Sequence, residues 1–124
     1  MNNGTERFSI EKRVKSVGHA WRGLRLFFKT THNAWVHVFL CLISFGAGFY
    51  FQVTSVEWLA LVIVAGLLFT AEAFNTAIEI DMDLTSPDFH PHARDTKDVA
   101  AGAVLISGIL MILINILVFA TKIQ

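Results

Sequence analysis

The sequence predicts an all-α membrane protein with an N-terminal amphipathic surface helix and three transmembrane helices. Two observations support this prediction. Of the 124 residues, 54% are apolar and 16% are charged, whereas roughly 25% of an average soluble domain is charged. Three apolar stretches are each close to the ~20 residues that a helix needs to cross a bilayer. We expect one integral-membrane domain, residues 1–124, because a chain this small and apolar cannot cover itself with a polar surface.

The composition also excludes several classes of protein. The single cysteine, Cys41, cannot build a disulfide framework. Ten basic residues are balanced by ten acidic residues, so the chain is not a strongly basic nucleic-acid binder. The charges are nevertheless segregated, because seven basic residues precede residue 30 and seven acidic residues lie between residues 72 and 98.

The first predicted element is a surface helix at about residues 9–30. Its apolar residues recur at spacings of three and four, and its basic residues lie largely off that stripe. The stripe consists of Ile10, Val14, Val17, Trp21, Leu24 and Phe28. A basic helix with an apolar face is typical of binding to an anionic lipid surface. The alternative is a soluble-type helix that packs on the rest of the protein.

The three predicted spans cover about residues 34–53, 58–80 and 99–120. They must be helical, because an open strand would leave unpaired backbone groups in lipid. Seven Lys and Arg residues lie in the N-terminal arm, none between residues 52 and 57, and two between residues 81 and 98. The positive-inside rule therefore places the N-terminus and the second connection in the cytoplasm and the C-terminus outside.

The second span carries a polar seam, defined as Glu72, Asn75, Thr76, Glu79 and Asp83. The spacing of these residues places them on one stripe of a helix. An acid at the centre of a span costs about 2.5–3.5 kcal/mol, which favours a functional site. The alternative is a helix end that emerges into water, which fits Asp83 better than the deeper Glu72.

A second polar cluster, residues 94–98, comes just before the third span. Asp95 or Thr96 could cap that helix. A lysine at a helix start opposes the macrodipole, so Lys97 there favours an anionic ligand such as phosphate. Alone, Arg94 and Lys97 could equally be topology anchors. Beside acids that can hold Mg²⁺, Lys97 indicates phosphoryl transfer at the membrane surface.

Two motifs resemble the prokaryotic diacylglycerol kinase family, which includes the undecaprenol kinases. They are the run from Glu72 to Glu79, EAFNTAIE, and the run from Lys97 to Val104, KDVAAGAV. The likeness extends to residues 21–25 of the arm and His90 of the loop. It implies a homotrimer in the bacterial inner membrane, with sites between subunits, that transfers the γ-phosphate of ATP to a lipid hydroxyl. Three helices enclose little volume, which agrees with a site shared between subunits.

The resemblance also implies roles for individual residues. Glu72 is the catalytic base, Asn75 supports the catalytic acids, and Glu79 binds Mg²⁺ together with the nucleotide phosphates. Lys97 and Asp98 engage the nucleotide, Lys97 through its phosphates.

Further positions in the family pattern lie around this centre. Asp83 and His90 are on the nucleotide side, Lys12 and His19 occupy arm positions that contact nucleotide, and Trp21 lies where the lipid approaches. One position departs from the pattern, because Thr31 stands where the family usually has a second metal-binding glutamate. A hydroxyl is a weaker Mg²⁺ ligand than a carboxylate.

Two questions stay open at this point. The lipid substrate is either diacylglycerol or undecaprenol, and the second motif favours the undecaprenol kinase branch. Besides the kinase hypothesis, a glutamate within a span also fits a small proton-coupled transporter. A structural membrane subunit is a third alternative. Neither alternative explains Lys97-Asp98 or the five-residue seam.

Overall fold

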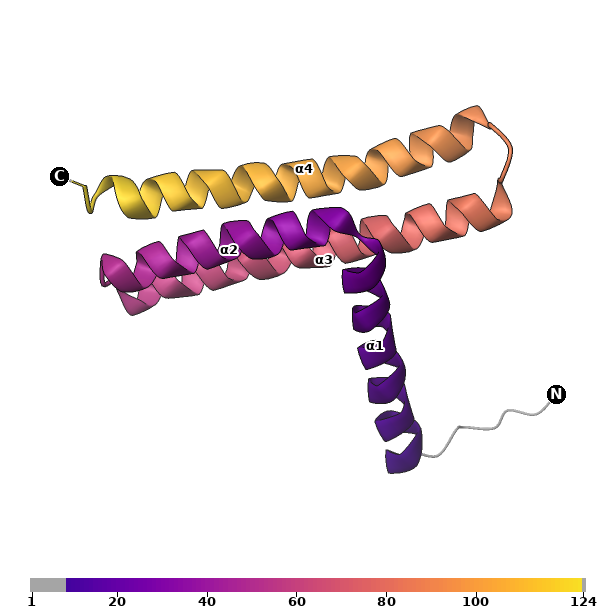
Figure 1. Ribbon diagram of the computed structural model, residues 1–124, viewed down its shortest axis with the longest axis horizontal. Coiled ribbons are helices and arrows are strands. Elements are labelled where there is room, and N and C mark those ends of the chain that lie inside the picture. Colours follow the sequence, from indigo (N-terminus) through magenta and orange to yellow (C-terminus); the bar gives the residue numbers. More distant parts are fainter. Residues whose placement is uncertain (1–8, 124) are drawn as a thin grey trace.

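The computed structural model describes residues 9–123 and consists there of four helices. They are α1 (Ile10–Thr30), α2 (His32–Tyr50), α3 (Ser55–Thr85) and α4 (Pro91–Ala120). Figure 1 shows α2, α3 and α4 running alongside one another, while α1 projects sideways from the start of α2. The last three helices are long and apolar enough to cross a membrane. The predicted all-α membrane fold is confirmed. Arg7, one of the seven basic residues of the arm, lies outside the described residues.

The corner between α1 and α2 is made by one residue. Thr31 ends α1, where its backbone N–H donates to the carbonyl of Phe27 at 2.9 Å, and also precedes the first turn of α2. Phe27 is buried at this corner, whereas Ile10, Val14 and Val17 of the apolar stripe are 67–72% exposed. The described chain therefore leaves the first half of the stripe uncovered, while Phe28 at its end contacts Phe69 of α3, and the uncovered half disfavours the soluble-type alternative.

The core lies between the three long helices, and α3 and α4 share the most extensive contact. One cluster of buried side chains combines Cys41 of α2, Leu68 of α3 and Met111 of α4. A second cluster near the far end contains Val53, Leu61 and Val118. Lipid is as apolar as these side chains, so within the bilayer their close van der Waals packing, and not their removal from water, holds the bundle together.

Polar contacts stabilise the end of the bundle opposite the α1–α2 corner. Thr54 and Glu57 form a capping box at the start of α3, in which each side chain binds the other residue's backbone N–H. The Glu57 carboxylate also pairs with Lys122, which follows α4, at 3.1 Å. These contacts tie the start of α3 to the end of α4.

The connection between α3 and α4 is shorter than the sequence predicts. Helix α3 continues to Thr85 instead of ending near residue 80, and α4 begins at Pro91 instead of residue 99. His90 is the N-cap of α4 and Pro91 occupies its first turn, a position that suits the fixed φ of proline. The predicted bounds are those of the apolar spans in lipid, and the helices extend beyond them because a helix can continue into water.

The earlier start of α4 changes the interpretation of the cluster at residues 94–98. Asp95 and Thr96 lie within the helix and do not cap it. Lys97 follows Pro91 by six residues, beyond the first turn, where the macrodipole effect has faded. The dipole argument for an anionic ligand at Lys97 was therefore wrong.

Candidate active site

A polar pocket of about 290 Å³ lies between the α1–α2 corner and α3. All five residues of the polar seam line it, together with residues 30–33 of the corner. The seam therefore forms one face of α3, as its spacing predicts, and that face is turned toward the corner.

The pocket is deepest at Glu72, whose side chain is 2% exposed. Asn75 and Thr76 are also buried, whereas Glu79 and Asp83 are exposed. The carboxylates thus run from the protein interior to the surface along α3. Burial of a carboxylate is costly without a hydrogen-bonding partner, and Glu72 has one, because Nε2 of His37 lies 3.2 Å from its Oε2.

Asn75 connects the buried and exposed parts of the pocket. Its Nδ2 donates to Oε1 of Glu79 at 3.1 Å. Its Oδ1 is buried and has no hydrogen-bond partner among the described residues. Such an unsatisfied acceptor is a group that a cation or a donor could fill.

The oxygen atoms of the pocket suit a Mg²⁺ ion that is bound partly by the protein and partly by a bound substrate. No group of three or more His, Cys, Asp or Glu residues able to hold a metal occurs within residues 9–123. Mg²⁺ usually binds through one or two carboxylates and substrate phosphates, however. The exposed Glu79 carboxylate can serve as such a ligand, and Asn75, whose Nδ2 donates to it, carries an unpaired oxygen.

Thr31, which the resemblance places where the family usually has a second metal-binding glutamate, makes a structural contact. Its Oγ1 lies 2.9 Å from Oγ1 of Thr76, a hydrogen bond between the α1–α2 corner and α3. The hydroxyl is thereby engaged within the protein.

Lys97 joins the second motif to the first. Its ammonium forms an ion pair with Asp83 at the outer end of the pocket. The contact crosses the short α3–α4 connection and brings the only cation of these two motifs to the polar seam.

Several predicted site residues lie outside the pocket. Lys12, His19 and Trp21 are exposed on α1, which projects away from the bundle (Figure 1). His90 caps α4, and Asp98 is exposed on that helix. None of these five residues lines the pocket in the described part of the chain.

His37 is a site neighbour that the sequence patterns did not single out. It lies in α2 within an otherwise uncharged span. An ionisable residue inside a span is itself a signal of function, and that signal could have identified it.

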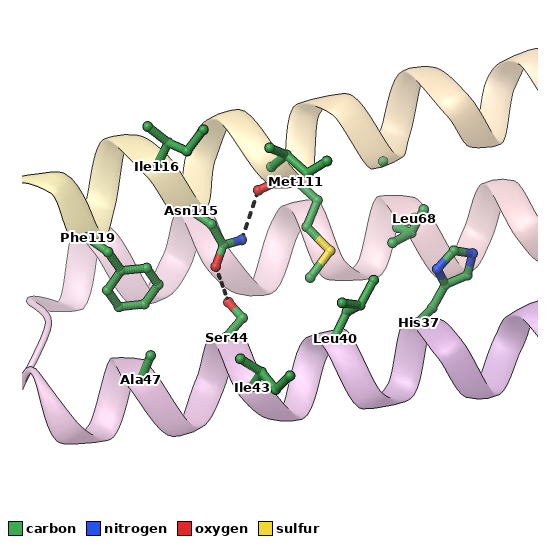
Figure 2. Close-up of a pocket in the computed structure, with 12 residues that line it drawn as sticks. His37, Leu40, Ile43, Ser44, Ala47, Leu68, Met111, Asn115, Ile116 and Phe119 are labelled. Atoms are coloured by element: carbon green, nitrogen blue, oxygen red, sulfur yellow. Dashed lines mark hydrogen bonds between the residues drawn. The ribbon is translucent and has the colours of Figure 1, made fainter.

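An apolar groove of about 370 Å³ lies between α2 and α4. Figure 2 shows it extending from Phe119 at one end to His37 and Leu68 at the other. One polar contact crosses it, because the Ser44 hydroxyl donates to Oδ1 of Asn115 at 2.6 Å. Leu68 is one helical turn before Glu72, so the groove and the polar pocket meet near His37.

The sequence model of one family, described as "Prokaryotic diacylglycerol kinase", matches residues 18–119. This match covers all three spans and both motifs. The chain belongs to the prokaryotic diacylglycerol kinase family.

Relatives within the family carry lipid kinase names. The chain is 32% identical to "Undecaprenol kinase" of Bacillus subtilis over 122 residues, which cover 98% of this chain and 99% of that protein. It is 31% identical to "Diacylglycerol kinase" of Synechocystis over 101 residues, 81% of this chain and 58% of that protein. It is 35% identical to "Diacylglycerol kinase" of Helicobacter pylori (strain 26695) over 77 residues, 62% of this chain and 60% of that protein. The chain is therefore a lipid kinase in a multi-pass membrane fold.

Proposed function

We propose that this lipid kinase transfers the γ-phosphate of ATP to the hydroxyl of undecaprenol. The observation that carries the proposal is the buried carboxylate of Glu72 at the inner end of a polar pocket in a membrane-spanning helix. Undecaprenol is favoured over diacylglycerol because the relative that aligns over 99% of its own length is named an undecaprenol kinase. The named diacylglycerol kinases align over 58–60% of theirs.

In this proposal Glu72 is the general base. It accepts the proton of the lipid hydroxyl while that oxygen bonds to the γ-phosphorus and the bond to the β-phosphate oxygen breaks, releasing ADP. Its place between apolar helix and polar pocket suits a hydroxyl at the end of a hydrocarbon chain. Asn75 orients Glu79 through the hydrogen bond between them.

The outer part of the pocket would hold the nucleotide. Glu79 and the amide oxygen of Asn75 would hold Mg²⁺, which when bound offsets the negative charge of the phosphates. Lys97 would exchange its contact with Asp83 for a phosphate oxygen. Asp98 and His90 would contact the nucleotide beyond the pocket.

The remaining residues of the proposed site would come from the surface helix and from other subunits. Lys12 and His19 would reach nucleotide and Trp21 would meet lipid when α1 lies on the anionic cytoplasmic leaflet. We propose a homotrimer in the bacterial inner membrane, with the N-terminus in the cytoplasm and the C-terminus outside.

Transfer of labelled phosphate tests this function directly. The purified protein, supplied with Mg²⁺ and γ-labelled ATP, should label undecaprenol more efficiently than diacylglycerol. Glu72→Gln should lower kcat by about 10²–10⁴-fold, the contribution of a general base, and should still bind ATP. Unlabelled lipid would favour the transporter or the structural subunit, and full turnover by Glu72→Gln would exclude Glu72 as the base.

A further inference from the structure

His37 is the side chain in contact with the proposed base, and no role has been assigned to it so far. We propose that it is a positioning residue for phosphoryl transfer. Its Nε2–H holds Oε2 of the Glu72 carboxylate, which leaves Oε1 to meet the lipid hydroxyl. This inference rests on the proposed role of Glu72.

The imidazole is fixed with respect to the helix that carries the base. The two groups are 3.2 Å apart, and their side chains are 15% and 2% exposed for His37 and Glu72. The ring of Phe69, on the same helix as Glu72, stands at 90° to the imidazole with 6.3 Å between ring centroids. His37 is thus held by one hydrogen bond and one aromatic contact, both to α3.

The surroundings distinguish the two neutral tautomers of the ring. Nδ1 of His37 is buried without a hydrogen-bond partner among the described residues. A proton on Nδ1 would therefore be an unsatisfied buried donor, and Nε2 would then turn a lone pair toward the lone pairs of the carboxylate. Of the two tautomers, the one with its proton on Nε2 avoids both costs and donates to Glu72.

The position of the pair suits an amphiphilic substrate. His37 closes one end of the apolar groove between α2 and α4 (Figure 2), and Glu72 lines the polar pocket. The two side chains thus stand between a surface for hydrocarbon and a site for charged groups. A base held there in one orientation meets the hydroxyl where a lipid changes from apolar to polar, and a fixed orientation raises the rate of the chemical step.

Two amides of different reach test the donor role. The amide nitrogen of His37→Gln can lie where Nε2 lies, whereas that of His37→Asn can reach only the Nδ1 position. We expect His37→Gln to keep kcat within about threefold of the wild type. His37→Asn should lower kcat by about tenfold to a hundredfold, the range typical of losing a hydrogen-bond partner that orients a metal ligand, with the KM for ATP unchanged.

His37→Leu removes the donor without adding an amide to bury, so it supplies the same comparison if His37→Asn does not fold. Cys41→Ala is the matched control, because it removes a buried side-chain atom from the core on the same helix, one turn from His37, and Cys41 lines neither the groove nor the polar pocket. It should lower the thermal midpoint and leave kcat within about twofold. A purely structural role for His37 would give the same pattern as this control.

Full kcat in His37→Asn or His37→Leu would overturn the proposal. An equal loss in the Gln and Asn variants would also overturn it, since a donor within reach would then make no difference. Glu72→Gln measured alongside separates this failure from failure of the proposed function. Retained turnover in that variant would remove Glu72 as the base, whereas an inactive Glu72→Gln beside a fully active His37→Leu would remove only the role of His37.

Discussion

Thr31 tests whether the proposed Mg²⁺ site uses a ligand at the position where the family pattern leads us to expect a second glutamate. Its hydroxyl is engaged with Thr76 at 2.9 Å, so we expect the side chain to support the fold and not to bind Mg²⁺. Thr31→Val has nearly the same shape and keeps the backbone hydrogen bond to Phe27. The substitution therefore removes the hydroxyl contact alone.

The cost of Thr31→Val follows from that contact. Loss of a typical hydrogen bond destabilises a protein by about 0.5–1.5 kcal/mol, and a buried partner left unsatisfied raises the cost to about 1–3 kcal/mol. Thr76 is 9% exposed and lines a polar pocket, which gives its hydroxyl access to other partners. We therefore expect a loss of about 1 kcal/mol, with kcat unchanged at saturating Mg²⁺.

The assay is kinase activity as a function of Mg²⁺ concentration, together with the thermal midpoint of each variant. Thr31→Val should shift the midpoint and leave half-saturation by Mg²⁺ unchanged. Thr31→Glu adds a carboxylate to the pocket and should lower the Mg²⁺ concentration that gives half-maximal activity roughly threefold or more. Glu79→Gln should raise that concentration. If Thr31→Val raised half-saturation as much as Glu79→Gln, the hydroxyl would be a metal ligand and the reasoning would be refuted.

Two further predictions concern packing and charge. A Cβ at Gly48 would lie 2.9 Å from the ring of Trp58, so Gly48→Ala should destabilise the α2–α3 contact by about 1–3 kcal/mol. Thermal midpoints should show this loss, and Trp58→Phe in the same chain should restore part of it. Lys97→Met should raise the KM for ATP by about tenfold or more, because the phosphates lose a cation, whereas Asp83→Asn frees Lys97 from its ion pair and should not raise it. Equal effects of the last two variants in steady-state assays would contradict a direct role for Lys97.

The fold was predictable because the length of an apolar span follows from the thickness of the bilayer, and the spacing of apolar residues in α1 follows from the helical repeat. All four helices occur near their predicted places, and the small residues Ala100 and Ser107 are buried in α4, where they permit close approach of α3. The helix ends were less predictable, since hydropathy does not report how far a helix continues into water. The N-cap at His90 depends on a local contact of its imidazole with the backbone of His92, a less common cap than Ser, Thr or Asp.

The candidate site was predictable where one helix carries it. The spacing from Glu72 to Asp83 placed five residues on one face, and the pocket includes all of them. Contacts between helices were not predictable from spacing. The approach of His37 to Glu72 and of Thr31 to Thr76 depends on how α2 packs against α3. The roles assigned to individual residues stay predictions until the variants are measured.

The charge of the pocket has a consequence for the nucleotide. Glu72, Glu79 and Asp83 line it, and no Lys or Arg does so among the residues described there. Lys97 stands at its edge, already paired with Asp83. A polyphosphate entering this site would meet repulsion from carboxylates unless it brought cations with it or met basic groups from elsewhere. Helix α1, which carries exposed cations, projects away from the bundle in one chain (Figure 1). On these electrostatic grounds we expect nucleotide binding to require Mg²⁺, and we expect basic groups of a second copy of the chain to complete the proposed site.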